Sequence, residues 1–271
     1  MPAPPDAPSA SPARLTIILP AYNEERRIGS ALDELFAYLT AGEPASEIGR
    51  PAAELPDWEV LVVDDGSTDA TADLVASRAE ATGHSPRLSV LREPHRGKGG
   101  AVRAGMLAAQ ADLLVFADAD LATPPDQLPL LTEALGAHDV ALGSRVQPDG
   151  SDRRRSQPLY RRLLGRMFHA LAAAWVTGPV PDTQCGFKGF RRATGHDLFS
   201  RQRVSSIVFD AEIIHLARRR GYRMAIVPVH WSDKRGSRLR PRPGLALRVL
   251  WDLVRIPLIH RGVGRARREA G

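Results

Sequence analysis

The sequence predicts an α/β protein in which a mostly parallel sheet is flanked by helices. From Leu15 onward, short apolar runs alternate with segments of helical periodicity, which is typical of a parallel sheet covered by helices. Carboxylates directly follow two of these runs, at the position where open α/β sheets bind ligands. The length of 271 residues, 43% of them hydrophobic, suits one globular domain with a substantial core.

Five apolar runs have the length of strands and are expected to form the sheet. The first ends at Pro20, and the second and fourth run directly into aspartates. Because helical segments separate the runs along the chain, a parallel arrangement is expected. The five runs are Leu15–Leu19, Trp58–Val63, Leu88–Leu91, Leu113–Ala117 and Val140–Gly143.

Helical periodicity between the runs predicts the layers that cover the sheet. Residues 24–40 carry apolar side chains at helical spacing, and Asn23 has the residue type of an N-cap for this helix. The next stretch, 41–56, is rich in proline and glycine and is expected to be a surface insertion. Further helices are expected through Leu74–Ala79 and Val102–Leu107.

Two basic amphipathic segments stand out in the second half of the chain. Residues 158–177 and 245–260 each combine an apolar stripe containing tryptophan with neighbouring arginines. Such helices either complete a protein core or lie in the headgroup region of a membrane, and the pattern leaves both open. The chain is accordingly divided into a disordered tail at 1–13, a domain at 14–240 and a basic amphipathic segment at 241–271.

The charge is distributed very unevenly between the two halves of the chain. Residues 1–144 hold 10 Lys and Arg against 22 Asp and Glu, a charge of −12, whereas residues 145–271 hold 27 against 9, a charge of +18. This asymmetry indicates that the first half holds a cation or reactive carboxylates, and that the second half meets an anion. Nucleic acid, acidic lipid headgroups and phosphorylated small molecules all fit the second half.

Other features of the composition limit where the chain works. Cys185 is the single cysteine, so no internal disulfide can form; a reducing compartment fits, and the thiol is expected to be buried and inert. No apolar run reaches about 18 residues, so no ordinary transmembrane helix is expected. The first 12 residues lack the basic and apolar regions of a signal peptide.

Asp118 and Asp120 stand one residue apart directly after an apolar run. In extended backbone, residues i and i+2 project to the same side, so both carboxylates can converge on one hard divalent cation, Mg²⁺ or Mn²⁺. Such a cation would bridge a diphosphate. In the competing interpretation, Asp118 caps the following turn and Asp120 is solvated. No dinucleotide-binding or P-loop glycine motif follows a strand.

Four motifs in order resemble the nucleotide-sugar motifs of the family 2 glycosyltransferases, which have the GT-A fold. They are Pro20-Ala21-Tyr22-Asn23-Glu24, Val62-Val63-Asp64-Asp65-Gly66-Ser67-Thr68-Asp69, Gly97-Lys98-Gly99 and Asp118-Ala119-Asp120. The resemblance covers about residues 15–231. It implies a GT-A domain at 14–240, in which residues 14–144 bind nucleotide sugar and metal and residues 145–240 meet the acceptor.

Later motifs are similar to those of one branch of this family, the dolichyl-phosphate β-glucosyltransferases and their polyprenyl-phosphate relatives. These motifs are Asp182-Thr183-Gln184-Cys185-Gly186-Phe187-Lys188-Gly189-Phe190, Phe209-Asp210-Ala211-Glu212, and Val229-His230-Trp231 followed by Gly236-Ser237-Arg238. That branch moves glucose from UDP-glucose to a lipid phosphate. The resemblance therefore implies an inverting hexosyltransferase with a UDP-sugar donor and a polyprenyl-phosphate acceptor.

The resemblance also assigns residues to the donor site. Metal ligands fall on Asp118 and Asp120, with Mg²⁺ or Mn²⁺ as the cofactor. Some dolichyl-phosphate mannosyltransferases carry Gln where this chain has Ala122, so a third protein ligand is missing there and water or phosphate must fill the position. The implied nucleotide-sugar contacts are Pro20, Ala21, Tyr22, Glu24, Asp65, Lys98 and Asp118.

The acceptor side needs cations more than it needs a base. A phosphate monoester has a second pKa of about 6, so near neutral pH it is largely a dianion and needs alignment rather than deprotonation. Arg145, Lys234 and Arg238 are the candidates for that role, against the alternative that each is a solvated surface residue. Asp182 and Asp210 are candidate catalytic carboxylates together with Arg145, while Asp210 also fits the N-cap of a helix.

Several alternatives stay open at this point. The donor could be GDP-mannose or a UDP-N-acetylhexosamine, and the acceptor could be soluble. A nucleic-acid-binding protein would use the +18 half, but only 6% of residues are aromatic and the four motifs would have no role. The expected partner is instead an anionic membrane that carries the acceptor, with the chain bound peripherally at its cytoplasmic face. The oligomeric state is left open.

Overall fold

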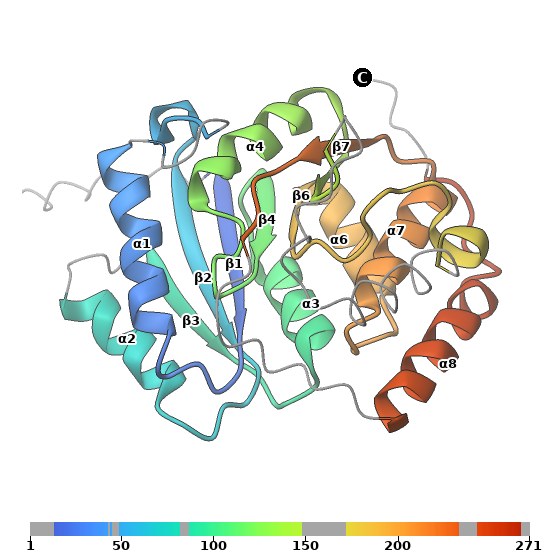
Figure 1. The fold of residues 1–271 in the computed structure, drawn as a ribbon, viewed down its shortest axis with the longest axis horizontal. Coiled ribbons are helices and arrows are strands. Elements are labelled where there is room, and N and C mark those ends of the chain that lie inside the picture. The colour runs from blue at the N-terminus through green and yellow to red at the C-terminus, as the bar shows by residue number, and fades with distance from the viewer. Residues whose placement is uncertain are drawn as a thin grey trace, which may run out of the picture.

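The structure is a computed structural model and describes residues 14–42, 44, 49–81, 87–147, 172–232 and 243–266. Within these residues the chain forms a seven-stranded sheet in the order β3-β2-β1-β4-β6-β5-β7, with helices on both faces (Figure 1). The expected tail at 1–13 and most of the expected helix at 158–177 lie outside the described residues.

All five strands predicted from the apolar runs are confirmed. Side chains of β1, β4 and β5 are almost all buried on both faces of the sheet, as in other parallel sheets that are covered by helices, whereas β3 at the edge is largely unburied. Strand β1 pairs in parallel with β2 and β4, and β2 pairs in parallel with β3. The five are β1 (Leu15–Ala21), β2 (Trp58–Asp64), β3 (Leu88–Arg92), β4 (Leu113–Ala117) and β5 (Val140–Ser144).

Two strands were not predicted, β6 (Phe187–Arg191) and β7 (Met224–Pro228). Strand β7 extends the sheet beyond β5 in parallel, whereas β6 is antiparallel to both β4 and β5. The reversal has a local consequence. Because β6 starts where its neighbours end, the residues that precede it, 182–186, lie at the carboxyl edge of the sheet.

The helices form two layers that follow the alternation of side chains along the strands. Leu15, Ile17 and Leu19 of β1 face a cluster with α1, α2 and α4, and Ile18 faces a cluster with α3, α6 and α7. The helices are α1 (Ile28–Ala41), α2 (Thr71–Ala81), α3 (Lys98–Ala108), α4 (Leu128–Ala137), α6 (Arg192–Arg201), α7 (Phe209–Arg220) and α8 (Pro243–Ile259), with short turns η1 (Ala52–Glu54), η2 (Pro125–Gln127) and η4 (Ala173–Thr177).

Helix α1 begins four residues later than the expected start at Glu24, and Asn23 does not cap it. Asn23 has a φ of 54° and its side-chain oxygen accepts a hydrogen bond from the Thr68 amide, 2.8 Å away. The local propensity for an N-cap therefore yields to a tertiary contact between two loops. The expected insertion at 41–56 contains η1, and part of it lies outside the described residues.

Helix α8 confirms the helix expected at 245–260. It packs on α7 and η4 through a third apolar cluster, which includes Val176, Ala211, Leu253 and Ile256. Figure 1 shows α8 at the side of the molecule farthest from α1 and α2. Among the helices that the structure describes, none is long and apolar enough to cross a bilayer.

Candidate active site

The first two motifs interlock at the carboxyl edge of β1 and β2. The Asn23 amide donates to Ser67 Oγ at 2.9 Å, and the Glu24 amide donates to Thr71 Oγ1 at 2.7 Å. Pro20 and Ala21 end β1, and the Ala21 carbonyl accepts a hydrogen bond from the Asp65 amide. These contacts hold in place the backbone that carries the predicted nucleotide-contacting residues Pro20, Ala21, Tyr22 and Glu24.

Asp65 is buried, and its carboxylate binds the loop that carries the third motif, Gly97-Lys98-Gly99. Its carboxylate accepts hydrogen bonds from the amides of Arg96 at 2.8 Å and Gly97 at 2.9 Å, and His95 Nδ1 lies 2.9 Å from its Oδ2. Direct contact of Asp65 with a nucleotide stays a prediction, while its role as an anchor of the loop 95–97 is visible. The ring of His95 stacks on the exposed Tyr22 with 4.2 Å between ring centroids.

His95 was missed as a site residue by sequence reasoning. It stands at the start of the glycine-rich stretch after β3, and that position was the available signal. The stacked His95 and Tyr22 rings offer a flat π surface at the edge of the site, which a base or a sugar ring could use.

The glycines around Lys98 allow the loop to press on a neighbouring turn. Gly97 has a φ of +91°, and the Gly99 amide donates to the Ser205 carbonyl at 3.0 Å. A Cβ on Gly99 would lie 2.7 Å from Phe209 Cβ, so only glycine fits there. The turn at 203–206 thus seats the start of α3, and Lys98 ion-pairs with Asp118.

Asp118 and Asp120 form the open part of the site, called here the acidic pair. About a third of the Asp118 side chain, 37%, is exposed. Burial and the neighbouring Asp118 raise the pKa of Asp120 above its ordinary value. The loop before β6 comes close to the acidic pair, because a Cβ on Gly186 would lie 2.1 Å from Asp118 Oδ2 and the Asp118 side chain would have to move.

The acidic pair fits a hard divalent cation. Two carboxylates that repel one another gain from a cation between them, and carboxylate oxygen suits Mg²⁺ and Mn²⁺. Among the residues that the structure describes, no third His, Cys, Asp or Glu completes a ligand cluster. That further ligands come from water or phosphate stays a prediction.

Arg145 and Asp182 are brought together as a closed pair. The guanidinium donates twice to the carboxylate, Nε to Oδ2 at 2.7 Å and Nη2 to Oδ1 at 2.8 Å, and the Arg145 amide donates at 3.0 Å. Only 12% of the Arg145 side chain is exposed, and this partial burial would lower its pKa, but the hydrogen bonds to Asp182 outweigh burial and raise it. The guanidinium also lies 5.6 Å from the centroid of the Trp231 ring.

Asp210 and Lys188 form a second closed pair. Lys188 Nζ donates to Asp210 Oδ1 at 2.7 Å and to the Cys185 carbonyl at 2.5 Å, and both side chains are buried. Burial raises the pKa of Asp210, although Lys188 and Lys98 oppose that rise. The interpretation of Asp210 as an N-cap is wrong, because α7 begins at Phe209 and its cap position is Val208.

Two further outcomes concern single residues in this region. The sequence does not identify Lys188 as a site residue, because nothing local shows that this lysine is buried against Asp210, 22 positions away. Cys185 is buried as expected, and burial raises the pKa of its thiol to about 12, which keeps it protonated and unreactive.

Cationic and anionic side chains follow one another at this edge. From inside to outside they are Lys188, Asp210 and Lys98, and then the two carboxylates of the acidic pair, Asp118 and Asp120; these five are called here the charge ladder. Burial lowers the pKa of Lys98, but the carboxylates of Asp118 and Asp210 outweigh it, so the net direction is upward. Lys98 therefore stays cationic beside the acidic pair.

Three predicted site residues have still to be accounted for. Glu24 accepts two hydrogen bonds from the Arg27 guanidinium, at 2.8 and 2.7 Å. Lys234 and Arg238, the other predicted acceptor-phosphate residues, lie outside the described residues. Catalytic roles for Arg145, Asp182 and Asp210 stay predictions.

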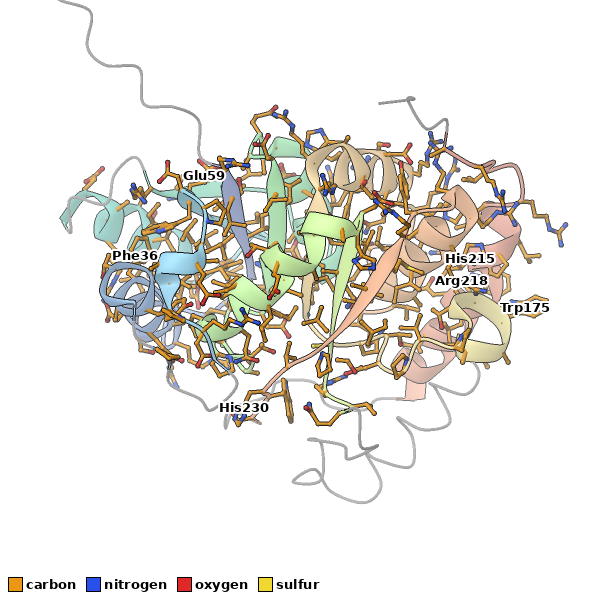
Figure 2. The ribbon with its side chains drawn as sticks, turned by 90° about the horizontal axis from the view of Figure 1, so that it is seen from above. Phe36, Glu59, Trp175, His215, Arg218 and His230 are labelled. Carbon is orange, nitrogen blue, oxygen red and sulfur yellow. The ribbon has the colours of Figure 1, made fainter. Side chains whose placement is uncertain are left out.

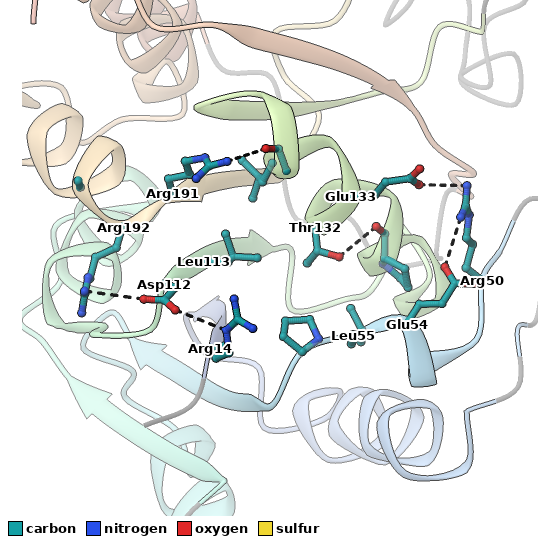
Figure 3. A pocket seen from close by; sticks show the side chains of 15 residues that line it. Arg14, Arg50, Glu54, Leu55, Asp112, Leu113, Thr132, Glu133, Arg191 and Arg192 are labelled. Carbon is teal, nitrogen blue, oxygen red and sulfur yellow. Dashed lines mark hydrogen bonds and ion pairs between the residues drawn. The ribbon is translucent and has the colours of Figure 1, made fainter. Parts of the chain in front are cut away.

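A hollow of about 900 Å³ lies at the opposite edge of the sheet and is not part of this site (Figure 3). Its arginines already have partners: Arg14 and Arg192 face Asp112, and Arg50 pairs with Glu54 and Glu133. The candidate active site is therefore the carboxyl edge.

The fold and the ordered motifs at that edge define the class of protein. Residues 16–199 match the model of Glycosyl transferase family 2, and the chain belongs to this family. Among solved structures, glucosyl-3-phosphoglycerate synthase from Mycobacterium tuberculosis, crystallised with Mn²⁺ and UDP-glucose, is similar with a TM-score of 0.60 and 20% identity. The match covers 96% of this chain and 82% of that one, and it supports the GT-A fold.

Curated relatives narrow the resemblance. A dolichyl-phosphate β-glucosyltransferase of Drosophila melanogaster is 38% identical over 87% of this chain and 71% of that protein. Dolichyl-phosphate β-glucosyltransferase ALG5C of Trichomonas vaginalis is 35% identical over 93% of this chain and 73% of that protein. The human protein of the same activity name is 31% identical over 84% of this chain and 70% of that protein.

Proposed function

We propose that this chain is an inverting, metal-dependent glycosyltransferase that moves glucose from UDP-glucose to a dolichyl-type polyprenyl phosphate. The observation that carries the proposal is the acidic pair beside Lys98 at the carboxyl edge, in a chain whose relatives are named for this reaction. Residues 14–144 would bind the donor and the metal, and residues 145–240 would meet the acceptor.

The donor reaction breaks an anomeric C–O bond and leaves negative charge on the departing diphosphate. Lys98 is held cationic next to the acidic pair, where it can bind that charge. A Mg²⁺ or Mn²⁺ ion held by Asp118 and Asp120 would add Lewis-acid stabilisation of the same charge. The stacked Tyr22 and His95 rings give the nucleotide a surface to lie against.

The acceptor would be a phosphate monoester, which is already a nucleophile near neutral pH. The closed pairs agree with such an acceptor, because Asp182 and Asp210 are each engaged by a cation rather than poised to remove a proton. Arg145 is the described candidate for the acceptor phosphate. Because Asp182 holds its fork, Arg145 would act through its charge and through the guanidinium edge that Asp182 leaves available.

A polyprenyl chain keeps its phosphate at the surface of a bilayer. The enzyme must therefore reach that surface, and its +18 half suits an anionic one. We place the chain peripherally at the cytoplasmic face of the membrane.

The test is to incubate the protein with labelled UDP-glucose, Mg²⁺ or Mn²⁺ and a polyprenyl phosphate in detergent, and to measure label in the organic phase. We expect label from UDP-glucose and little from labelled GDP-mannose or UDP-N-acetylglucosamine. Transfer should stop when the metal is chelated and in Asp120→Asn. The matched control is Asp112→Asn, an exposed aspartate that is ion-paired with Arg14 at the opposite edge.

Two results would contradict the proposal. Label that never enters the organic phase with any donor would exclude a lipid-phosphate acceptor. Transfer that survives Asp120→Asn at the wild-type rate would exclude the acidic pair as the metal site.

A further inference from the structure

Helix α8 has an exposed apolar stripe. Its members are Leu250, Trp251, Val254 and Leu258, and Trp251 is 63% exposed. At about 100° per residue these four side chains fall within an arc of about 100° on the helix surface. A stripe of this kind on a soluble surface marks a contact with another apolar phase.

The opposite face of α8 is buried and specifically bonded. Leu253 and Ile256 pack into the third apolar cluster, and Asp252 accepts a 2.6 Å hydrogen bond from Ser206 Oγ. His260 Nε2 lies 2.7 Å from Glu212 Oε1. These contacts fix the rotation of α8 about its own axis, and the apolar stripe therefore faces outward.

Trp175 of η4 extends the stripe. Its indole nitrogen donates to the Val254 carbonyl at 3.3 Å, while 54% of the residue remains exposed. Figure 2 shows Trp175 and Arg218, which belongs to the last turn of α7, toward the same side of the molecule. We call Trp175, Leu250, Trp251, Val254 and Leu258 the α8 patch.

The surroundings of the α8 patch are cationic. Residues 243–266 contain four arginines and one aspartate, and that aspartate, Asp252, is buried. Arg218 and Arg219 at the end of α7 are exposed as well. Tryptophan and aliphatic side chains rimmed by arginine are the composition of a helix that lies in the headgroup region of an anionic bilayer.

We propose that the α8 patch is a bilayer-docking surface that enters the interface of an anionic membrane. The proposal deepens the proposed function and rests on it, because a polyprenyl-phosphate acceptor is what would bring the protein to a bilayer. Docking would also fix the orientation of the site. Asp252 holds Ser206, and the adjacent Ser205 carbonyl holds the Gly99 amide, so the docked helix grips the turn that seats Lys98.

The experiment is flotation of the full chain with vesicles of phosphatidylcholine and phosphatidylglycerol in equal parts, with phosphatidylcholine alone as the neutral comparison. We expect the wild type to float with the anionic vesicles only. Leu258→Glu should lower the floated fraction about tenfold, because it places a carboxylate in the apolar stripe. The matched control, Leu74→Glu on α2, changes an equally exposed leucine far from α8 and should float like the wild type.

Tryptophan fluorescence provides a second readout. Anionic vesicles should shift the emission of the wild type to the blue, and Trp251→Phe should lose much of that shift while it still floats. Absence of wild-type flotation, or equal flotation of Leu258→Glu and the wild type, would overturn the proposal. So would a dimer that Leu258→Glu dissociates in a protein that does not float, since a second copy would then cover the patch.

Binding of UDP with Mn²⁺ is measured on the same variants in solution. Leu258→Glu and Leu74→Glu should bind UDP like the wild type. A protein that floats but does not bind UDP would contradict the proposed function and leave the docking surface standing, so the two failures are distinguishable.

Discussion

The carboxyl edge of the sheet carries two kinds of carboxylate: some are partly exposed, and others are buried against a cation. The acidic pair, Asp118 and Asp120, is partly exposed, and Lys98 ion-pairs with Asp118. Asp182 and Asp210 lie deeper, each buried against its own cation, Arg145 or Lys188. The same residue type at the same edge is therefore found in two states: Asp182 and Asp210 belong to closed pairs that join elements of the fold, and the open acidic pair is the one proposed to bind a ligand.

The largest loss of stability is expected when one partner of a closed pair is removed. Asp210→Ala would leave Lys188 charged and buried without its partner, and we expect the free energy of unfolding to fall by about 3–5 kcal/mol. Chemical denaturation measures this. Asp112→Ala, which removes an exposed pair, should change it by less than about 1 kcal/mol. Equal losses in the two variants would remove the distinction between closed and open carboxylates.

The second prediction concerns the open pair. Asp118→Asn changes a proposed metal ligand that is also the partner of Lys98, and we expect kcat/KM to fall about a hundredfold, which is close to 2.7 kcal/mol of transition-state stabilisation. The free energy of unfolding should stay within about 1 kcal/mol of the wild type, because the pair is partly exposed. A variant that unfolds rather than losing turnover would place Asp118 with the closed carboxylates.

Gly186→Ala tests the contact between the two clusters. The new Cβ would meet Asp118 Oδ2, and overpacking of this kind costs about 1–3 kcal/mol unless the loop moves. We expect lower stability and weaker Mn²⁺-dependent binding of UDP, measured by thermal shift. The control is Gly136→Ala in α4, where nothing lies within 4 Å of the added Cβ. Comparable UDP binding in both variants would show that the loop yields freely.

The smallest expected effect is a pH dependence of the free energy of unfolding that is caused by the buried His215 of α7. Burial lowers the pKa of His215 below its usual value, with His260 and the nearby arginines acting in the same direction. The unfolded chain then binds more protons than the folded one, so stability is complete above the ordinary histidine pKa and is lost as pH falls below about 6.5. Denaturation from pH 7.5 to 5 should show this slope, and His215→Phe should flatten it. An unchanged slope in the variant would assign the effect to other groups.

The sequence predicts the five parallel strands because each is a continuous apolar run, and it predicts the edge at which the site lies because the motifs follow those runs. Strand β6 escapes prediction because Lys188 and Gly189 interrupt its apolar pattern. The lysine is tolerated only because Asp210, on another element, neutralises it. Which carboxylates are open and which are closed depends on such long-range partners, so the residue pattern alone cannot divide them. Asn23 fails as a cap for the same reason, since its partners come from the loop after β2.

The charge ladder has a consequence for how the protein responds to ionic strength. Its inner pair, Lys188 and Asp210, is buried, so dissolved salt, which screens over about 8 Å under physiological conditions, changes the interaction of that pair little. Arg218, Arg219 and Arg261 near the α8 patch are exposed, and their attraction to an anionic surface is screened directly. Raising the salt concentration would therefore weaken the proposed binding to a bilayer while leaving the buried Lys188–Asp210 pair nearly unchanged.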